Sequence, residues 1–250
     1  MSRNQPNRTM TDRYRRRFLG AIGLGASALI PGVHMVELAT AKPDDQAVTA
    51  KTRWGMLIDT SKCAEGCKAC VDACNDEHGL EGFDRPETDV QWIRKVELKD
   101  RTTGKQSSLP LLCQHCENPP CVDVCPTGAS FKRADGIVLV NKHTCIGCRY
   151  CMMACPYKAR SFVHEDLTNQ RPWSPRGKGT VESCTFCVHR VDKDRQPACV
   201  EACDAAGHKA LVFGDLNDVD SQVAMRAREV PSRQLRADLN LNTGVRYEGI

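Results

Sequence analysis

The chain has 250 residues, of which 41% are hydrophobic and only 5% aromatic, and its formal net charge is +4. Six of its 35 basic and two of its 31 acidic residues lie in the first 41 positions, which leaves 29 of each sign in the remainder. A neutral body of this size argues against nucleic-acid binding and has room for one or two small domains.

Residues 1–41 are predicted to form a twin-arginine export signal. Tyr14 to Leu19 reads YRRRFL, and the apolar stretch from Phe18 to Ile30 suits a signal core but is too short to span a bilayer. Small residues at 39–41 offer a cleavage site, so we expect the mature chain to begin at Lys42. We therefore expect a periplasmic protein that is exported already folded; an uncleaved membrane anchor is the alternative.

The rest of the chain alternates cysteine-rich runs with short elements. We predict a hairpin from Val90–Leu98 and Gln106–Leu112 that turns near Thr103 and Gly104. Strands are expected over 136–140 and 210–213. Between them, residues 157–183 are rich in proline, glycine and charge, which favours a covering or docking loop.

The segment 215–250 is predicted to be a tail that wraps over the body or over a partner. A helix is expected over Ser221–Glu229, capped by Asp218 or Asp220 and stopped by Pro231. The fold class that we expect is α+β with short elements and long loops.

The sixteen cysteines fall into four runs of four, each of which ends in C-x3-C. In chain order the runs are Cys63, Cys67, Cys70 and Cys74; Cys113, Cys116, Cys121 and Cys125; Cys145, Cys148, Cys151 and Cys155; and Cys184, Cys187, Cys199 and Cys203. The third run, with Pro156 after it, matches the C-x2-C-x2-C-x3-C-P pattern of a bacterial [4Fe–4S] ferredoxin. An exported chain could instead use cysteines in disulfides or zinc sites, but neither explains four runs with these spacings.

The runs are expected to share ligands in pairs. In two-cluster ferredoxins the last cysteine of each run binds the cluster of the other run, because the C-x3-C step starts a helix that carries it away. We therefore expect four [4Fe–4S] clusters, at sites that we number 1 to 4. Site 1 has Cys63, Cys67, Cys70 and Cys203; site 2 has Cys184, Cys187, Cys199 and Cys74; site 3 has Cys113, Cys116, Cys121 and Cys155; site 4 has Cys145, Cys148, Cys151 and Cys125.

This pairing predicts two nested ferredoxin-like modules within residues 42–214. The inner module covers about 113–156 and the outer module 52–75 plus 184–214, with insertions at 76–112 and 157–183. Since every run is complete, His78 and His115 are expected to lie near clusters or at the surface and not to bind iron. No catalytic arrangement of side chains is recognisable, so we expect an electron-transfer protein and not an enzyme.

The four runs, their nesting and the export signal resemble the four-cluster ferredoxin subunits of membrane-bound respiratory complexes. The resemblance covers most of residues 52–214. Arg53 to Asp59 (RWGMLID), residues 175–182 (PRGKGTVE) and the wide Cys63/Cys67 spacing are similar to the DsrO type of iron–sulfur subunit, which belongs to the Dsr complex of dissimilatory sulfur metabolism.

The resemblance implies partners as well as a function. They are an NrfD-like integral membrane subunit that interacts with quinone, a periplasmic multihaem cytochrome, and further membrane and cytoplasmic redox subunits. It implies electron relay with no small-molecule substrate of its own. Runs 1 and 4 depart from the pattern, because Asn75 and Asp204 replace the final proline. With the x3 spacing between Cys63 and Cys67 in addition, site 1 is expected to be the least secure cluster.

Two alternatives stay open. The first is the electron-transfer subunit of a periplasmic molybdopterin oxidoreductase of the polysulfide or tetrathionate reductase type. The second is a secreted scaffold stabilised by zinc or disulfides, which would be colourless and free of iron.

Overall fold

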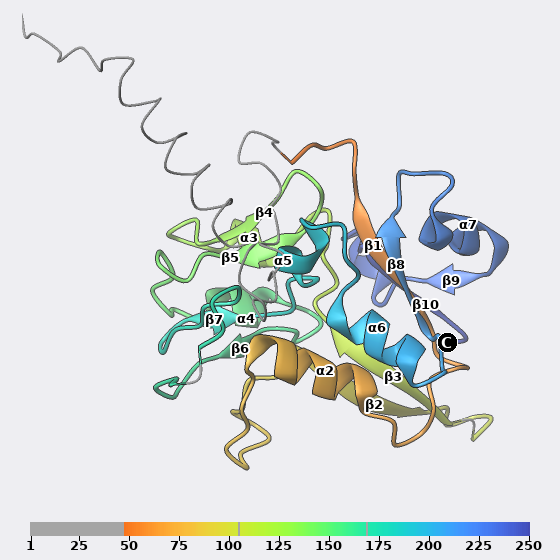
Figure 1. Ribbon diagram of the computed structural model, residues 1–250, viewed down its shortest axis with the longest axis horizontal. Helices are drawn as coiled ribbons and strands as arrows, with labels where there is room; N and C mark the ends of the chain where they lie inside the picture. Colours follow the sequence, from red (N-terminus) through yellow and green to blue (C-terminus); the bar gives the residue numbers. More distant parts are fainter. Residues whose placement is uncertain (1–47, 105, 169) are drawn as a thin grey trace, which may run out of the picture. The chain divides into compact units, whose positions relative to one another are not determined.

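The computed structural model describes residues 48–104, 106–168 and 170–250. The predicted export signal and its cleavage site lie outside the described residues. Short helices and short strands alternate along the chain, in agreement with the predicted mixed fold (Figure 1). Within the described ranges, no helix is both long enough and apolar enough to cross a membrane.

The largest sheet has four strands in the order β8-β1-β10-β9, with bounds Leu211–Asp215, Trp54–Asp59, Val245–Glu248 and Ser232–Arg233. Strand β1 pairs antiparallel with β8 and parallel with β10. Because β1 is covered on both faces, its apolar run Met56-Leu57-Ile58 is almost completely buried. This sheet, drawn in Figure 1, contributes Met56, Ile58, Leu211, Phe213, Val245 and Tyr247 to the main apolar core.

The C-terminal segment is part of that sheet, and our prediction of a wrapping tail was wrong at its end. Val245 and Tyr247 of β10 are fully buried, while Arg246 and Glu248 point to the other side. An alternation of only four residues is too short to identify a strand from the sequence, and its partner β1 lies far away in the chain.

The helix that we predicted over Ser221–Glu229 lies close to its predicted position. Helix α7 spans Gln222–Glu229, but its cap is Ser221, whose hydroxyl accepts a hydrogen bond from the backbone N–H of Ala224 at 3.2 Å. Asp218 instead accepts from the N–H of Asp220 in the preceding turn, so the predicted aspartate cap was wrong by one to three positions.

Three two-stranded hairpins make up the other sheets. They are β2 with β3 (Ile93–Lys99 and Gln106–Leu112), β4 with β5 (Ser130–Lys132 and Val138–Val140), and β6 with β7 (Ser161–Phe162 and Val181–Glu182). The first confirms the predicted hairpin, although its first strand begins at Ile93 and not at Val90. The third closes the base of the segment 157–183, so the prediction of a loop throughout this segment was wrong at its two ends.

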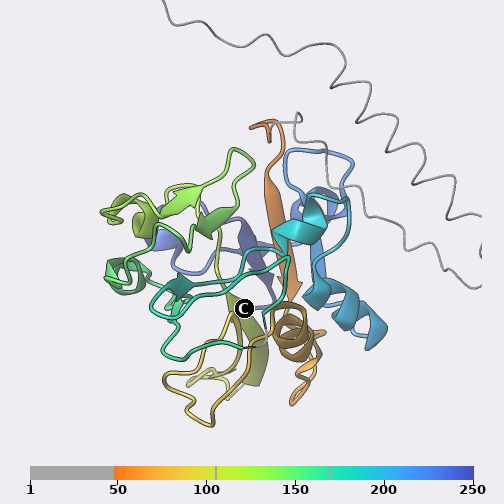
Figure 2. The same cartoon turned by 60° about the vertical axis from the view of Figure 1, so that its left-hand side comes forward.

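Short helices carry the third cysteine of each run, and in runs 1 and 4 the fourth as well. These are α2 (Ala69–His78), α3 (Pro120–Asp123), α4 (Tyr150–Ala154) and α6 (Ala198–Ala205); α5 (Val188–Val191) and a 3₁₀ helix (Ala237–Leu239) lie between or after them. Helices α2 and α6 lie side by side in both views, which places runs 1 and 4 next to each other (Figures 1 and 2).

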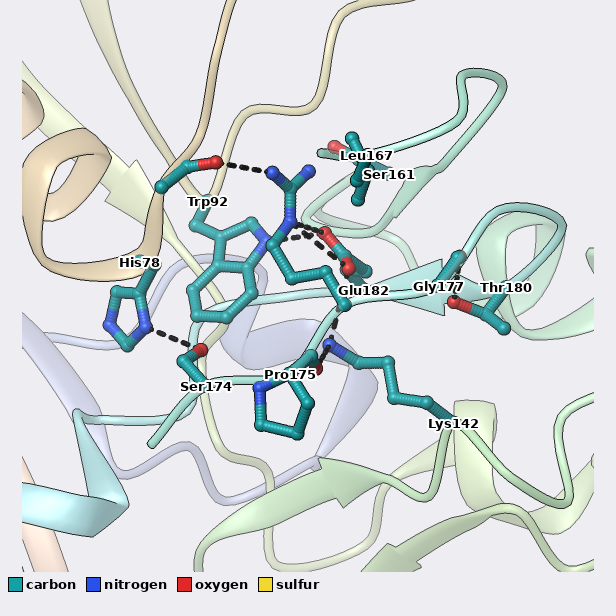
Figure 3. A network of polar contacts seen from close by, with 12 residues as sticks. His78, Trp92, Lys142, Ser161, Leu167, Ser174, Pro175, Gly177, Thr180 and Glu182 are labelled. Atoms are coloured by element: carbon teal, nitrogen blue, oxygen red, sulfur yellow. Dashed lines mark hydrogen bonds and ion pairs between the residues drawn. The ribbon is translucent and has the colours of Figure 1, made fainter. Parts of the chain in front are cut away.

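The segment 157–183 is fixed to the body through the buried carboxylate of Glu182. Figure 3 shows Glu182 between the indole of Trp92 and the ammonium of Lys142, and both donate to it. Arg176 also donates to Glu182 at 3.0 Å, and Ser174 lies 2.9 Å from Nδ1 of His78. The loop therefore lies over the end of helix α2.

Candidate metal centres

All sixteen cysteines are free thiols in the described part of the chain. Eleven are buried, and only Cys148 is exposed. The C-x3-C steps of runs 1 and 4 lie on the helices α2 and α6, and those of runs 2 and 3 begin on the helices α3 and α4. Four sites result, and each takes cysteines from two runs.

Site 1 lies at the N-terminal end of helix α2. The side chains of Cys63, Cys67, Cys70 and Cys203 line one cavity together with Lys95. Burial, and next the neighbouring Cys63, raises the pKa of Cys70 to about 11. The N–H of Ala210 also donates to the sulfur of Cys203 at 3.3 Å.

Site 2 is completely enclosed between helices α2 and α6. Burial raises the pKa of Cys74 well above its usual value, and Cys184, Cys199 and Cys187 raise it further. Nε2 of His78 lies 3.3 Å from the sulfur of Cys187. Burial, followed by the charge of His189, lowers the pKa of His78 to about 3, so its ring is neutral.

Site 3 brings the last cysteine of run 3 to the first three of run 2. Burial raises the pKa of Cys113 and of Cys116 to about 12. Cys113, Cys121 and Cys155 each raise the pKa of Cys116, which places the four thiols together.

Site 4 is the most exposed of the four. Cys125, Cys145, Cys148 and Cys151 line one cavity at the surface. Burial raises the pKa of Cys125, but the N–H of Ser130, at 3.3 Å from its sulfur, and the groups of Thr127 outweigh this and lower the pKa. Gly147 sits here at φ +68°, where a Cβ would lie 2.2 Å from the backbone oxygen of Gly179. Only glycine fits at this position of the C-x2-C turn.

The four sites follow one another in the order 1, 2, 3, 4. Cys70 of site 1 and Cys74 of site 2 are one turn apart on helix α2. Cys113 of site 3 raises the pKa of Cys184 in site 2, and Cys151 of site 4 raises the pKa of Cys121 in site 3. Each site therefore has cysteines of the next site close enough to affect the pKa of its own thiols.

The residues present fit iron–sulfur clusters. Every site offers four sulfurs, and backbone N–H groups donate to the sulfurs of Cys125, Cys184 and Cys203. Four thiols buried together resist deprotonation, and a metal centre would supply the positive charge that stabilises the thiolates. Among the described residues, no three His, Cys, Asp or Glu side chains converge on the position of a single metal ion.

The two histidines lie where they were expected, near the sites. His115 is buried, stacks on Phe186 at 3.7 Å between ring centroids, and accepts from the N–H of Val138 through Nδ1. Two cations near the sulfurs, Lys95 and Arg160, were not predicted. An isolated basic residue in a half-buried strand, such as Lys95 in β2, is the only signal that the sequence offers for them.

Two models of 4Fe–4S dicluster domains match the chain, at residues 49–129 and 105–216. The chain is 41% identical to "Hdr-like menaquinol oxidoreductase iron-sulfur subunit 1" of Archaeoglobus fulgidus, over 93% of this chain and 97% of the relative. It is 38% identical to Protein NrfC of Escherichia coli, over 90% of each chain, and 38% identical to a tetrathionate reductase subunit of Salmonella typhimurium, over 85% of this chain and 78% of the relative.

These matches define a ferredoxin-type protein that binds [4Fe–4S] clusters. More narrowly, the chain belongs to the NrfC/DsrO-type family of iron–sulfur subunits, which transfer electrons within oxidoreductase complexes and are not their catalytic subunits. The predicted resemblance is confirmed.

Proposed function

We propose that the sixteen cysteines hold four [4Fe–4S] clusters at sites 1 to 4, with the shared ligands that the sequence predicts. The observation that carries this is the grouping itself, because the four sites together use every cysteine once. Each cluster transfers one electron, and the order of the sites makes a single path through both nested modules.

Site 4 lies at one end of the path and is more exposed than site 1 at the other end. This exposure supports contacts with a partner at site 4. Cys148 is exposed, and Ile146, Tyr150 and Met153 around it are 67%, 59% and 75% exposed. Apolar side chains exposed as a group mark a protein interface more often than a free surface. We propose that one redox partner docks here, and that the path continues from site 1 to another.

We propose that the protein works in the periplasm, exported folded by the twin-arginine route, and is attached to the inner membrane through other subunits. Residues 1–41 carry the export pattern. Export of a folded protein allows the clusters to be assembled in the cytoplasm, where thiols remain reduced.

We propose a place in a Dsr-type complex of sulfur metabolism. The partners would be an NrfD-like membrane subunit that interacts with quinone, a periplasmic multihaem cytochrome, and further membrane and cytoplasmic redox subunits. The likeness to a menaquinol oxidoreductase subunit over nearly the whole chain supports this.

The alternative is the electron-transfer subunit of a molybdopterin oxidoreductase, and the likeness to a tetrathionate reductase subunit favours it. Purification of the complex from membranes, followed by identification of its subunits, tests the two. A multihaem cytochrome together with a quinone-interacting subunit supports the first function. A molybdopterin subunit bound to this chain would overturn it in favour of the second.

A further inference from the structure

Arg160 is a buried cation that no carboxylate neutralises in the described part of the chain. It follows Cys155 in the chain and directly precedes strand β6, is only 5% exposed, and its Nε, Nη1 and Nη2 have no oxygen or nitrogen as hydrogen-bond partner there. By contrast, Arg133 binds both Asp135 and Asp192. A guanidinium buried without a partner is unfavourable, so its place in the fold needs another explanation.

The groups around Arg160 are sulfurs of two different sites. Cys121 and Cys113 belong to site 3, and Cys151 belongs to site 4. Cys121 and Cys151 belong to one buried cluster that also packs against Phe162, two residues after Arg160 in the chain. Burial lowers the pKa of Arg160, but the charges of Cys121, Cys113 and Cys151 and a hydrogen bond to the sulfur of Cys151 outweigh it and raise the pKa.

The other cations that line the same cavity are more exposed than Arg160, and the half-buried Arg94 donates to the backbone oxygens of Tyr157 and Lys158. Lys158, two residues before Arg160, is exposed, and the guanidinium of Arg149 lies over the ring of Phe162 at 3.9 Å. Water and salt screen such charges strongly, whereas a buried charge is screened much less. The charge of Arg160 is therefore less screened than those of Lys158 and Arg149.

We propose that Arg160 is a counter-charge shared by the clusters of sites 3 and 4, and that it raises the reduction potentials of both. This rests on the proposed four-cluster function. Uptake of one electron takes a cluster with four thiolates from a charge of about −2 to about −3, with no proton and no bond change. A fixed positive charge nearby stabilises the more negative state more strongly, so reduction becomes easier.

The test is a redox titration of the holoprotein, as purified with its clusters, in which electron paramagnetic resonance follows each reduced cluster. One-electron mediator dyes supply the electrons. Arg160→Gln removes the charge while keeping a long polar side chain. We expect two of the four signals to shift to lower potential. The shift should be at least 59 mV, which for a one-electron couple corresponds to a tenfold change in the ratio of reduced to oxidised cluster.

Two further variants control the result. Lys158→Gln removes the same formal charge from the surface nearby and should leave all four potentials unchanged. Arg160→Lys keeps the charge, and the same two potentials should stay closer to wild type than in Arg160→Gln. If Arg160→Gln does not retain its clusters, the potentials of Arg160→Lys are measured in its place.

The outcomes separate this inference from the proposed function. A protein with about four clusters whose potentials do not differ between wild type and Arg160→Gln would overturn the role of Arg160 alone. Equal shifts in Arg160→Lys and Arg160→Gln would overturn it too, because the charge would then not be the cause. A wild-type protein without iron would overturn the proposed function itself.

Discussion

The ammonium group of Lys95 donates a hydrogen bond of 2.8 Å to the sulfur of Cys63, and a second of 3.3 Å to the backbone oxygen of Ala64. It ties the hairpin β2–β3 to the first C-x3-C turn. The spacing between Cys63 and Cys67 is one residue wider than in the ferredoxin pattern, and Lys95 holds the sulfur of Cys63 at this wider turn.

Replacing Lys95 by Met should make the cluster at site 1 labile. The variant loses the donor to Cys63 and a positive charge beside four thiolates, and groups that orient metal ligands typically contribute 10- to 100-fold to metal affinity. The measurement is the rate at which a chelator removes iron from the holoprotein, and we expect about one quarter of the iron to be released at least tenfold faster. Lys99→Met, on the exposed end of the same strand, is the matched control, and equal rates in both variants would contradict the role of Lys95.

The cysteine pairing makes a prediction of its own. Cys148→Ser and Cys125→Ser should alter the same paramagnetic signal although these residues come from different runs, because both line the cavity of site 4. Cys155→Ser should alter another signal, since this thiol lies with Cys116 in site 3. If Cys148→Ser and Cys155→Ser affect one and the same cluster, the ligands are not shared between runs.

The buried ion pairs of Glu182 should be important for stability. Glu182 is 0% exposed and binds Lys142 and Arg176, so Glu182→Gln leaves two cations without their counter-charge. Loss of one partner of a buried pair costs about 3–5 kcal/mol of unfolding free energy. We expect a lower thermal midpoint and faster proteolysis within 163–180. Lys178→Gln breaks an exposed pair with Asp166 in the same loop and should change neither measurement.

The carboxylate of Asp59 links the central strand β1 to helix α7, and its effect depends on pH. It accepts from Arg226 at 2.7 Å and is only 2% exposed. Burial raises the pKa of Asp59, but hydrogen bonds from Ser61 and Lys62 outweigh this and lower the pKa below its ordinary value. The stabilising contribution is therefore present above about pH 4 and is lost as pH falls through the lowered pKa.

Asp59→Asn should consequently destabilise the holoprotein by about 2 kcal/mol at neutral pH, the size of a hydrogen bond to a charged group. Thermal unfolding at about pH 7 and about pH 3 checks this, and the difference between variant and wild type should shrink in acid. The difference is compared because acid lability of the clusters affects both proteins alike. A difference independent of pH would show that the charge of Asp59 is not what matters.

Much of the fold that positions the sites could be predicted, because it rests on local patterns. The hairpin β2–β3 follows from alternating residues on either side of Thr103 and Gly104, and Gly104 does adopt the left-handed conformation that such a turn needs. The C-x3-C steps form helices for an equally local reason. These elements carry the cysteines from which we propose the four sites.

Features that depend on distant parts of the chain could not be predicted. Strand β10 is a core strand only because β1 offers it a hydrogen-bonding edge. Arg160 is surrounded by thiols from run 2 as well as from run 3, and no local pattern reports that. The cations that act on the sulfurs were missed because burial of a charge is decided by tertiary packing.

The most direct test of the account is the content of iron and acid-labile sulfide per chain, measured on the protein purified without oxygen. The account predicts a brown protein with about sixteen iron atoms and about sixteen sulfides, four of each for each of the four sites. A colourless protein without iron, with its cysteines in disulfides or bound to zinc, would contradict it.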